Sequence, residues 1–233
     1  MHHTNSRLLA GLLCVAASAS AAAANVSSSF DTDADGWTAT SFADISTLFT
    51  SPPLQTGILP TFHSAGGELA GFISVADPDS GWTYFVAPSP FLGDQSDKLG
   101  GALTFALQQQ ANGGSFLSPP GTVVLRSGSL VLVHQAGVLP PASAPDWTLY
   151  GVGLEAIHWR IAGTGDAVTD AQFAQALSAL DGLFIAAEFI TPVNEITGLD
   201  SVNLVAPVPV PAAIWGLASA LGVLGLRGRR RRA

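Results

Sequence analysis

Hydrophobic and polar residues alternate along much of the middle of the chain, and alternation with a period of two is typical of half-buried β-strands. Residues 103–107 show this pattern. Residues 122–126 and 130–134 are instead runs rich in β-branched residues and leucine, and they flank a Ser-Gly-Ser turn at 127–129. Two such runs with a short turn between them predict a hairpin. Residues 183–190 are hydrophobic almost throughout, which favours a strand in the core of a sandwich.

One segment has helical periodicity instead. Thr169 and Gln172 have the spacing of a capping box, and hydrophobic residues then recur at helical intervals up to Leu180. Residues 149–157 alternate less regularly, and clusters of Pro and Gly separate the strand segments. Many short strands with one short helix predict a mainly all-β fold, a jelly roll or β-sandwich.

The C-terminal segment departs from this pattern. Pro207, Pro209 and Pro211 precede an uncharged apolar run at 212–226. A helix of that length measures about 22 Å, short of the roughly 30 Å hydrocarbon core, so it would span a bilayer only with local thinning. Five arginines would hold its end on the cytoplasmic side as a membrane stop. These are Arg227, Arg229, Arg230, Arg231 and Arg232.

This segment resembles the PEP-CTERM sorting signal, and the motif that carries the resemblance is Val208-Pro209-Val210-Pro211-Ala212. The family usually has Val-Pro-Glu-Pro or Val-Pro-Leu-Pro, so the glutamate is missing here and the proline spacing is kept. The resemblance implies transient anchoring in the inner membrane of a Gram-negative bacterium and processing by an exosortase. A permanent C-terminal anchor is the alternative.

The N-terminus has the pattern of a secretory signal peptide. Arg7 precedes an apolar stretch at 8–17, and small residues follow, so signal peptidase is expected to cut between Ala21 and Asn25. The single cysteine, Cys14, lies within the apolar stretch, which leaves the mature protein without disulfides. The expected organisation is a signal peptide at 1–24, a β-sandwich domain at 25–205 and a sorting tail with a hydrophobic helix at 206–233.

Charge is segregated along the chain. The body keeps only Lys98, Arg126 and Arg160 of the nine basic residues, whereas all seventeen acidic residues fall between Asp31 and Asp200. Its net charge is therefore −14. Nucleic acid binding is excluded, because phosphate contacts require a basic face.

The body also resembles the laminin B domain, or laminin IV type A. The early element is Phe30-Asp31 with Gly36-Trp37, and the segment at 84–94 reads Tyr-Phe-Val-Ala-Pro-Ser-Pro-Phe-Leu-Gly-Asp. Residues 99–105, the hairpin after Thr122, Trp147, the Leu154-Glu155…Trp159 segment and residues 198–204 follow in the family's order, with Leu99 in place of a tyrosine. The resemblance implies an extracellular jelly roll of the carbohydrate-binding-module or galactose-binding-like type, without known catalysis. The cysteine-rich neighbours of laminin are absent, so a laminin-like network role does not carry over.

An acidic motif is the first candidate site. Asp31, Asp33 and Asp35, followed by Gly36, have the spacing of the first half of an EF-hand calcium loop. The twelfth position is a phenylalanine, so no bidentate glutamate closes the loop, and a solvated acidic turn is the alternative. The laminin B resemblance implies that the first and last strands lie side by side, which would bring Asp31 near Asp200 at a structural calcium.

Aromatic residues are the second candidate site. Trp37, Trp82, Tyr84, Trp147 and Trp159 could stack on sugar rings if two were exposed on one face, and we assign the first three to a ligand site. The alternative is that these side chains fill the core.

Catalytic motifs are scarce. The chain has no Gly-x-Ser-x-Gly elbow and no His spacing typical of zinc sites. Glu68, Glu155 and Glu188 are candidates for a glycosidase pair, although their spacing does not place two of them in one cleft.

These patterns together predict an exported, non-catalytic surface or matrix protein with a role in adhesion or carbohydrate binding in exopolysaccharide or biofilm. A secreted glycan-active hydrolase and a purely structural envelope protein without a ligand are the alternatives. Exposed aromatic residues on one face would favour sugar binding, and paired carboxylates in a cleft would favour hydrolysis.

Overall fold

The computed structural model describes residues 24–43, 53–119, 121–134, 141–191 and 194–208. The predicted signal peptide up to residue 23 lies outside the described residues. So do Pro209, Val210, Pro211 and Ala212 of the predicted sorting motif, and the arginine cluster. Within the described ranges, no helix is long and apolar enough to cross a bilayer.

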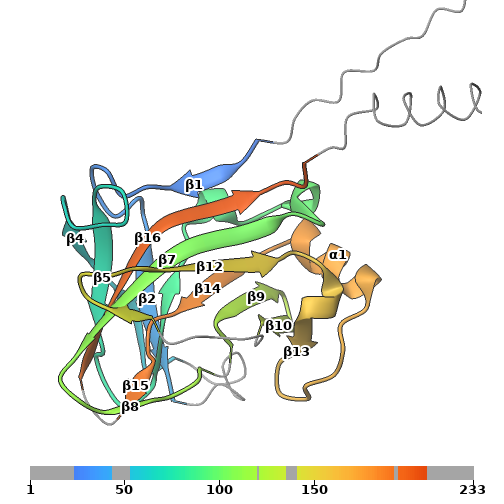
Figure 1. The fold of residues 1–233 in the computed structure, drawn as a ribbon. Coiled ribbons are helices and arrows are strands. Elements are labelled where there is room, and N and C mark those ends of the chain that lie inside the picture. Colours follow the sequence, from blue (N-terminus) through green and yellow to red (C-terminus); the bar gives the residue numbers. More distant parts are fainter. Residues whose placement is uncertain (1–23, 44–52, 120, 135–140, 192–193, 209–233) are drawn as a thin grey trace, which may run out of the picture.

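Two seven-stranded sheets face each other and form a β-sandwich (Figure 1), which confirms the predicted fold class. The first sheet contains β1 (Val26–Ser28), β4 (Thr61–His63), β5 (Phe72–Ala76), β7 (Ala102–Ala111), β11 (Ala142–Ser143), β12 (Thr148–Gly153) and β16 (Glu195–Val205). The second contains β2 (Thr38–Phe42), β3 (Gln55–Ile58), β6 (Trp82–Val86), β9 (Val123–Ser127), β10 (Leu130–His134), β13 (Trp159–Ile161) and β14 (Gly182–Ala186). A small separate ladder joins β8 (Ser115–Phe116) to β15 (Ile190–Thr191).

The strand order places β16 at the centre of the first sheet. It pairs with β7 on one side, and with β5 and β1 in turn on the other. The first and last strands therefore lie side by side, as the laminin B resemblance implied, with Val26 opposite Leu204. The two ends of the domain leave from the same end of the sandwich (Figure 1).

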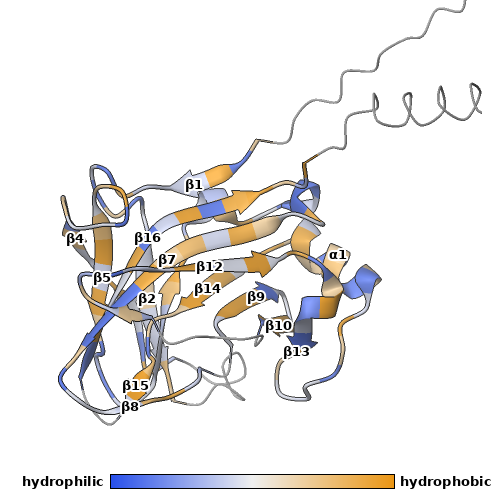
Figure 2. Cartoon of the chain, in the orientation of Figure 1, coloured by the Kyte–Doolittle hydropathy of each residue, from blue (hydrophilic) through white to orange (hydrophobic). Residues whose placement is uncertain are grey.

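The core fills the space between the sheets. Side chains alternate between the two faces of a strand, so Ile73 and Val75 of β5 are buried in the core while Phe72 and Ser74 face outward. β14 is buried along its whole length, and Figure 2 colours it hydrophobic throughout, whereas hydrophobic and hydrophilic colours alternate along β16. Burying each large apolar side chain contributes about 1.5–3 kcal/mol, so this layer supplies most of the stability of a domain without disulfides.

The predicted helix is confirmed as α1 (Asp170–Ser178). The Thr169 hydroxyl accepts a hydrogen bond from the Gln172 backbone amide, and the Gln172 side chain accepts one from the Thr169 amide, which completes the capping box. The buried face of α1 packs on the core, where the rings of Phe173 and Trp159 are 5.5 Å apart.

The strand predictions hold for β7 and for the hairpin of β9 and β10. Two predicted strand segments are longer than the observed strands. Strand β12 ends at Gly153, and residues Ala156–His158 form a short 3₁₀ helix instead. Strand β14 ends at Ala186, because the chain then leaves the sheet to form the β8–β15 ladder.

Candidate functional site

The outer face of the first sheet is partly covered by the β4–β5 loop, residues 64–71. The Trp147 indole Nε1 donates to the Gly66 carbonyl at 3.2 Å, and the Asp200 Oδ2 atom accepts from the Glu68 amide at 2.7 Å. Gly67 has no space for a side chain, since a Cβ there would lie 2.6 Å from Asp200 Oδ2. These contacts hold the loop against the sheet.

Asp200 therefore acts as an anchor for this loop. Its side chain is fully buried, and Oδ1 accepts from the Ser201 amide at 2.6 Å. Burial raises the pKa of the carboxyl, and the backbone amides of Ser201, Glu68 and Leu69 oppose that rise by stabilising the charge. Ser201 has a φ of 52° at the β-bulge that turns these groups toward the loop.

The acidic turn after β1 also uses its carboxylates locally. Asp31 accepts from the Ser29 hydroxyl at 2.8 Å, Asp33 from the Asp35 amide at 2.7 Å, and Asp35 from the Phe30 amide at 3.2 Å. Carboxylates that accept backbone amides in this way form turns.

The predicted calcium set of Asp31, Asp33, Asp35 and Asp200 is not assembled. In the described part of the chain, no three Asp, Glu, His or Cys side chains are arranged so that they could hold a metal ion. The residues as placed do not fit a calcium ion, and the calcium site stays a prediction.

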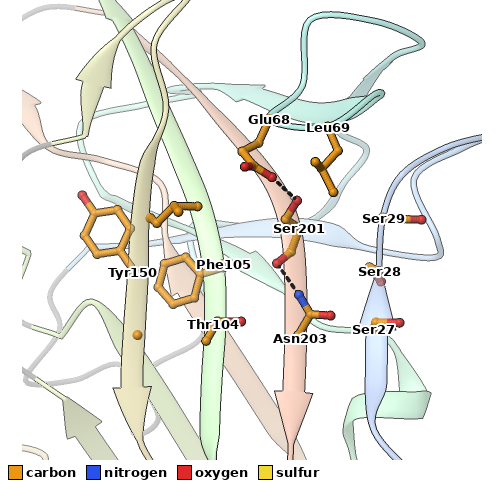
Figure 3. A pocket seen from close by; sticks show the side chains of 12 residues that line it. Ser27, Ser28, Ser29, Glu68, Leu69, Thr104, Phe105, Tyr150, Ser201 and Asn203 are labelled. Atoms are coloured by element: carbon orange, nitrogen blue, oxygen red, sulfur yellow. Dashed lines mark hydrogen bonds between the residues drawn. The ribbon is translucent and has the colours of Figure 1, made fainter.

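Two grooves lie on the outer face of the first sheet. We call the larger, of about 540 Å³, the polar groove; it is lined by Ser27, Ser28, Ser29, Glu68, Leu69, Thr104, Phe105, Leu149, Tyr150, Gly151, Ser201 and Asn203. Figure 3 shows Glu68 and Leu69 of the loop above β16, with the three serines of the β1 segment along one side.

The polar groups of this groove are largely paired with each other. The Ser201 hydroxyl donates to Glu68 Oε2 at 3.1 Å, and the Asn203 amide donates to the Ser201 carbonyl at 2.8 Å (Figure 3). The Ser28 hydroxyl accepts from the Trp37 indole at 2.9 Å. A ligand here would have to compete with existing hydrogen bonds.

We call the second groove, of about 330 Å³, the glutamine groove. Strands β4, β5, β16 and β7 form its floor, and Trp147 covers one side of it. Its lining residues are Thr61, His63, Phe72, Ser74, Ala76, Gln108, Gln109, Gln110, Ala144, Ile196 and Gly198, none of which is Asp, Glu, Lys or Arg.

Aromatic rings form one wall of the glutamine groove. The ring of His63 stacks on that of Phe72, with centroids 4.3 Å apart and planes 10° apart, and the Trp147 ring meets Phe72 edge-on at 5.3 Å. A hydrogen bond of 2.8 Å between His63 Nε2 and the Ser74 hydroxyl fixes the imidazole. Such a wall offers apolar contact beside polar groups.

Strand β7 lines the groove with glutamines, and two of their side-chain oxygens have no hydrogen-bond partner among the described residues. Gln108 is 7% exposed and its Oε1 atom has no hydrogen bond; Gln109 Oε1 has none either, although Gln109 Nε2 donates to Ser143. The glutamine side chain lies flat because Gly198 is beneath it: a Cβ on Gly198 would be 2.9 Å from Gln108 Cγ and 3.1 Å from Trp147 Cη2. Glutamine amides both donate and accept hydrogen bonds, so these side chains suit a ligand with neutral polar groups.

The predicted aromatic site needs correction. Trp37 is 1% exposed and Tyr84 is fully buried, so both rings belong to the core and neither can stack on a sugar. Trp82 is half-buried on β6 of the other sheet. Of the five aromatic candidates, Trp147 reaches the outer face. The polar run at the end of β7 is the sequence signal that could have indicated the groove beside it.

A third cavity, of about 300 Å³, is acidic and includes Asp77, Asp79 and Glu188 in its lining. Asp79 accepts from the Ser41 hydroxyl, the Gln55 amide and the Gly81 backbone amide. Its carboxylate thus joins separate strands.

Glu188 is 7% exposed and accepts from the Thr83 amide at 3.2 Å. Burial, with help from the nearby charges of Asp77, Glu195 and Asp79, raises its pKa to about 7. Of the other two candidates for a hydrolase pair, Glu68 lines the polar groove, and Glu155 is exposed beside His158 at 3.6 Å. The three predicted glutamates therefore do not share a cleft.

Comparison with known proteins gives one family match, to Laminin B (Domain IV), over residues 84–218, which is more than half of the chain. None of the curated proteins matches the chain.

Among solved structures, the L4b domain of human laminin α-2 has a TM-score of 0.51 at 17% identity, covering 58% of this chain and 80% of that domain. The family 11 carbohydrate-binding module of cellulosomal cellulase Lic26A-Cel5E of Clostridium thermocellum scores 0.44 at 14% identity, covering 81% and 99%. A structure of the family 11 module from that organism with a β-1,3-1,4-mixed-linked tetrasaccharide scores 0.45 at 14% identity, covering 80% and 98%.

Proposed function

Because the chain belongs to the laminin B (domain IV) family, we propose that it is a non-catalytic extracellular module that binds a neutral polysaccharide in the glutamine groove. The observation that carries the proposal is the glutamine groove itself, whose lining has no charged side chain and combines an aromatic wall with three successive glutamines of β7. The aromatic wall accommodates the apolar C–H face of a sugar ring, and the glutamine amides, which both donate and accept hydrogen bonds, suit its hydroxyls.

Charge argues for a neutral ligand. The body has a net charge of −14, and its three basic side chains all bond within the protein. Lys98 donates to Asp97, Arg126 to Asp181, and Arg160 to the Trp159 carbonyl. A uronic acid or sulfated chain would meet repulsion without a compensating cation.

A pair of variants tests the site. Gln108→Ala is expected to weaken binding of mixed-linked β-glucan or a neutral galactan about tenfold or more in calorimetry, a loss of about 1.4 kcal/mol. Gln175→Ala, an exposed glutamine on α1, serves as the matched control and should bind as the unchanged protein does.

Alginate, a polyanion, is expected not to bind. Equal affinity in the Gln108→Ala variant would place the ligand elsewhere, and preference for alginate would contradict the neutral ligand. No binding across the panel would favour the purely structural alternative.

We also propose that the protein reaches the cell exterior through the predicted signal peptide and PEP-CTERM-like tail. Replacing Pro209 and Pro211 with alanine should leave unprocessed precursor in the membrane fraction, because the proline motif is the expected recognition element. Intact mass of the membrane and extracellular fractions measures this. Normal release of the double variant would argue against a sorting role for these prolines.

A further inference from the structure

A buried ammonium lies where the predicted signal peptide joins the folded domain. The Lys98 side chain is 2% exposed, and its Nζ atom donates to the Ala24 carbonyl at 2.7 Å and to Asp97 at 2.6 Å. Asp97 is 45% exposed, so the Ala24 carbonyl is the only acceptor other than this partly exposed carboxylate that the described residues show for the buried ammonium. Removing an acceptor from a buried charge is costly.

The residues around Ala24 belong to the fold. Lys98 is held in place by its own amide, which donates to the Gln95 carbonyl at 2.9 Å. Asn25 Oδ1 accepts from the Ala206 amide at 3.3 Å, and strand β1 starts at Val26. The sequence leaves the cleavage position open, because each bond between Ala21 and Asn25 has small residues at the required places.

We propose that the mature protein keeps Ala24, so that signal removal cuts a bond on the N-terminal side of this residue and the signal peptide is shorter than the 1–24 expected from the sequence. This inference rests on the proposed export. Hydrolysis consumes one water, leaves a carboxylate on the released peptide and creates an α-ammonium on the mature chain. After a cut before Ala24, its carbonyl still accepts from Lys98. After a cut between Ala24 and Asn25, that carbonyl is lost, and the new ammonium of Asn25 lies beside the buried ammonium of Lys98.

The cleavage position is tested first by intact mass of the exported protein. A mature chain that begins at Ala22, Ala23 or Ala24 supports the proposal. A chain that begins at Asn25 overturns it while leaving export intact. An uncleaved chain overturns both proposals.

The stabilising role of the Lys98–Ala24 hydrogen bond is tested with two forms of the chain. One starts at Ala24, the other starts at Asn25, and both are otherwise complete. The Asn25 form is expected to melt several degrees lower at pH 7. In a Lys98→Met background, the difference between the two forms should largely disappear, because no buried cation then needs the carbonyl.

Raising the pH toward 9 gives a second readout that needs no variant. It neutralises the α-amino group, whose usual pKa is about 7.7–8.0, and should narrow the gap between the two forms. Equal melting temperatures at pH 7, or a gap that persists unchanged in Lys98→Met, would overturn the explanation.

Discussion

Asp200 and Glu188 are both buried carboxylates, but they differ in how many hydrogen-bond donors surround them. Asp200 accepts three backbone amides and thereby fixes the loop that separates the polar groove from the glutamine groove. Glu188 accepts one amide and is surrounded by other carboxylates, so its charge is poorly compensated. Both carboxyls have raised pKa values, so ionisation opposes the fold at each, and the amides around Asp200 reduce that opposition.

Asp200→Asn is expected to destabilise the protein by about 1–3 kcal/mol, because an amide nitrogen replaces one oxygen and leaves backbone donors without an acceptor. Urea unfolding measures the loss, and faster hydrogen exchange at Glu68 and Leu69 locates it. Asp166→Asn, at an exposed turn, is the control. Unchanged exchange in the loop would contradict the anchoring role.

The raised pKa of Glu188 predicts how the free energy of unfolding depends on pH. Its folded pKa of about 7 lies above the value of 4.5 for the free side chain, so the folded state holds the proton more tightly than the unfolded state. The stabilisation is complete below about pH 4.5 and is lost as the pH rises through 7, by at most about 3 kcal/mol. Unfolding free energies measured from pH 4.5 to 8 should fall in this window.

Glu188→Gln removes this titration and should flatten that part of the profile, whereas Glu155→Gln, at an exposed position, should not. Asp77, Glu195 and Asp200 also have raised pKa values, so they act in the same direction at lower pH. A stability that rises from pH 5 to 7 would refute this account.

At the scale of elements, the outer face of the first sheet depends on close approach between strands and loops. Gly198 of β16 lies under Gln108 of β7 and under Trp147, which comes from the segment before β12. Three parts of the chain that are far apart in sequence thus meet over a single residue without a side chain.

Gly198→Ala should disturb the glutamine groove without touching the core, because a Cβ would push against Gln108 and Trp147. We expect weaker polysaccharide binding with a small change in melting temperature. Gly151→Ala is the matched control: it is also a strand glycine of this sheet, it has nothing within 4 Å of a new Cβ, and it lines the polar groove. Loss of binding in Gly151→Ala alone would indicate that the ligand binds in the polar groove.

Calcium provides a separate test of the turn after β1. An unchanged melting temperature on addition of calcium or of a chelator would show that Asp31, Asp33 and Asp35 serve only the hydrogen bonds that they accept within the protein. A rise of several degrees with calcium would show that these carboxylates rearrange around an ion.

Local patterns predicted the elements better than the surface. The capping box of α1 and the β9–β10 hairpin depend on residues a few positions apart, so the local sequence was enough to predict them. The glutamine groove depends on the packing of Trp147 and the β4–β5 loop over β16, which no local pattern encodes. Trp37 and Tyr84 were misassigned for a related reason: the local sequence does not reveal which aromatic side chains pack between the two sheets.

At the scale of the whole molecule, residues 25–205 are acidic and contain no cysteine, so their stability depends on the core and on paired polar groups. The family resemblance extended the prediction furthest, because it implied the adjacent first and last strands that the structure contains. It did not reveal that Asp200 would anchor the β4–β5 loop.

The side-by-side position of the two ends also determines how the domain responds to a pulling force. Strand β1 runs antiparallel to the end of β16, and both ends leave from the same side of the molecule. The ladder hydrogen bonds of an antiparallel pair run perpendicular to the strands. Tension between the two ends would therefore load the bonds of this pair one after another, as in opening a zipper, instead of shearing all of them at once. A module held at one end and pulled at the other is thus expected to release β1 at low force, while a load applied through a ligand in the glutamine groove would fall on the central strands.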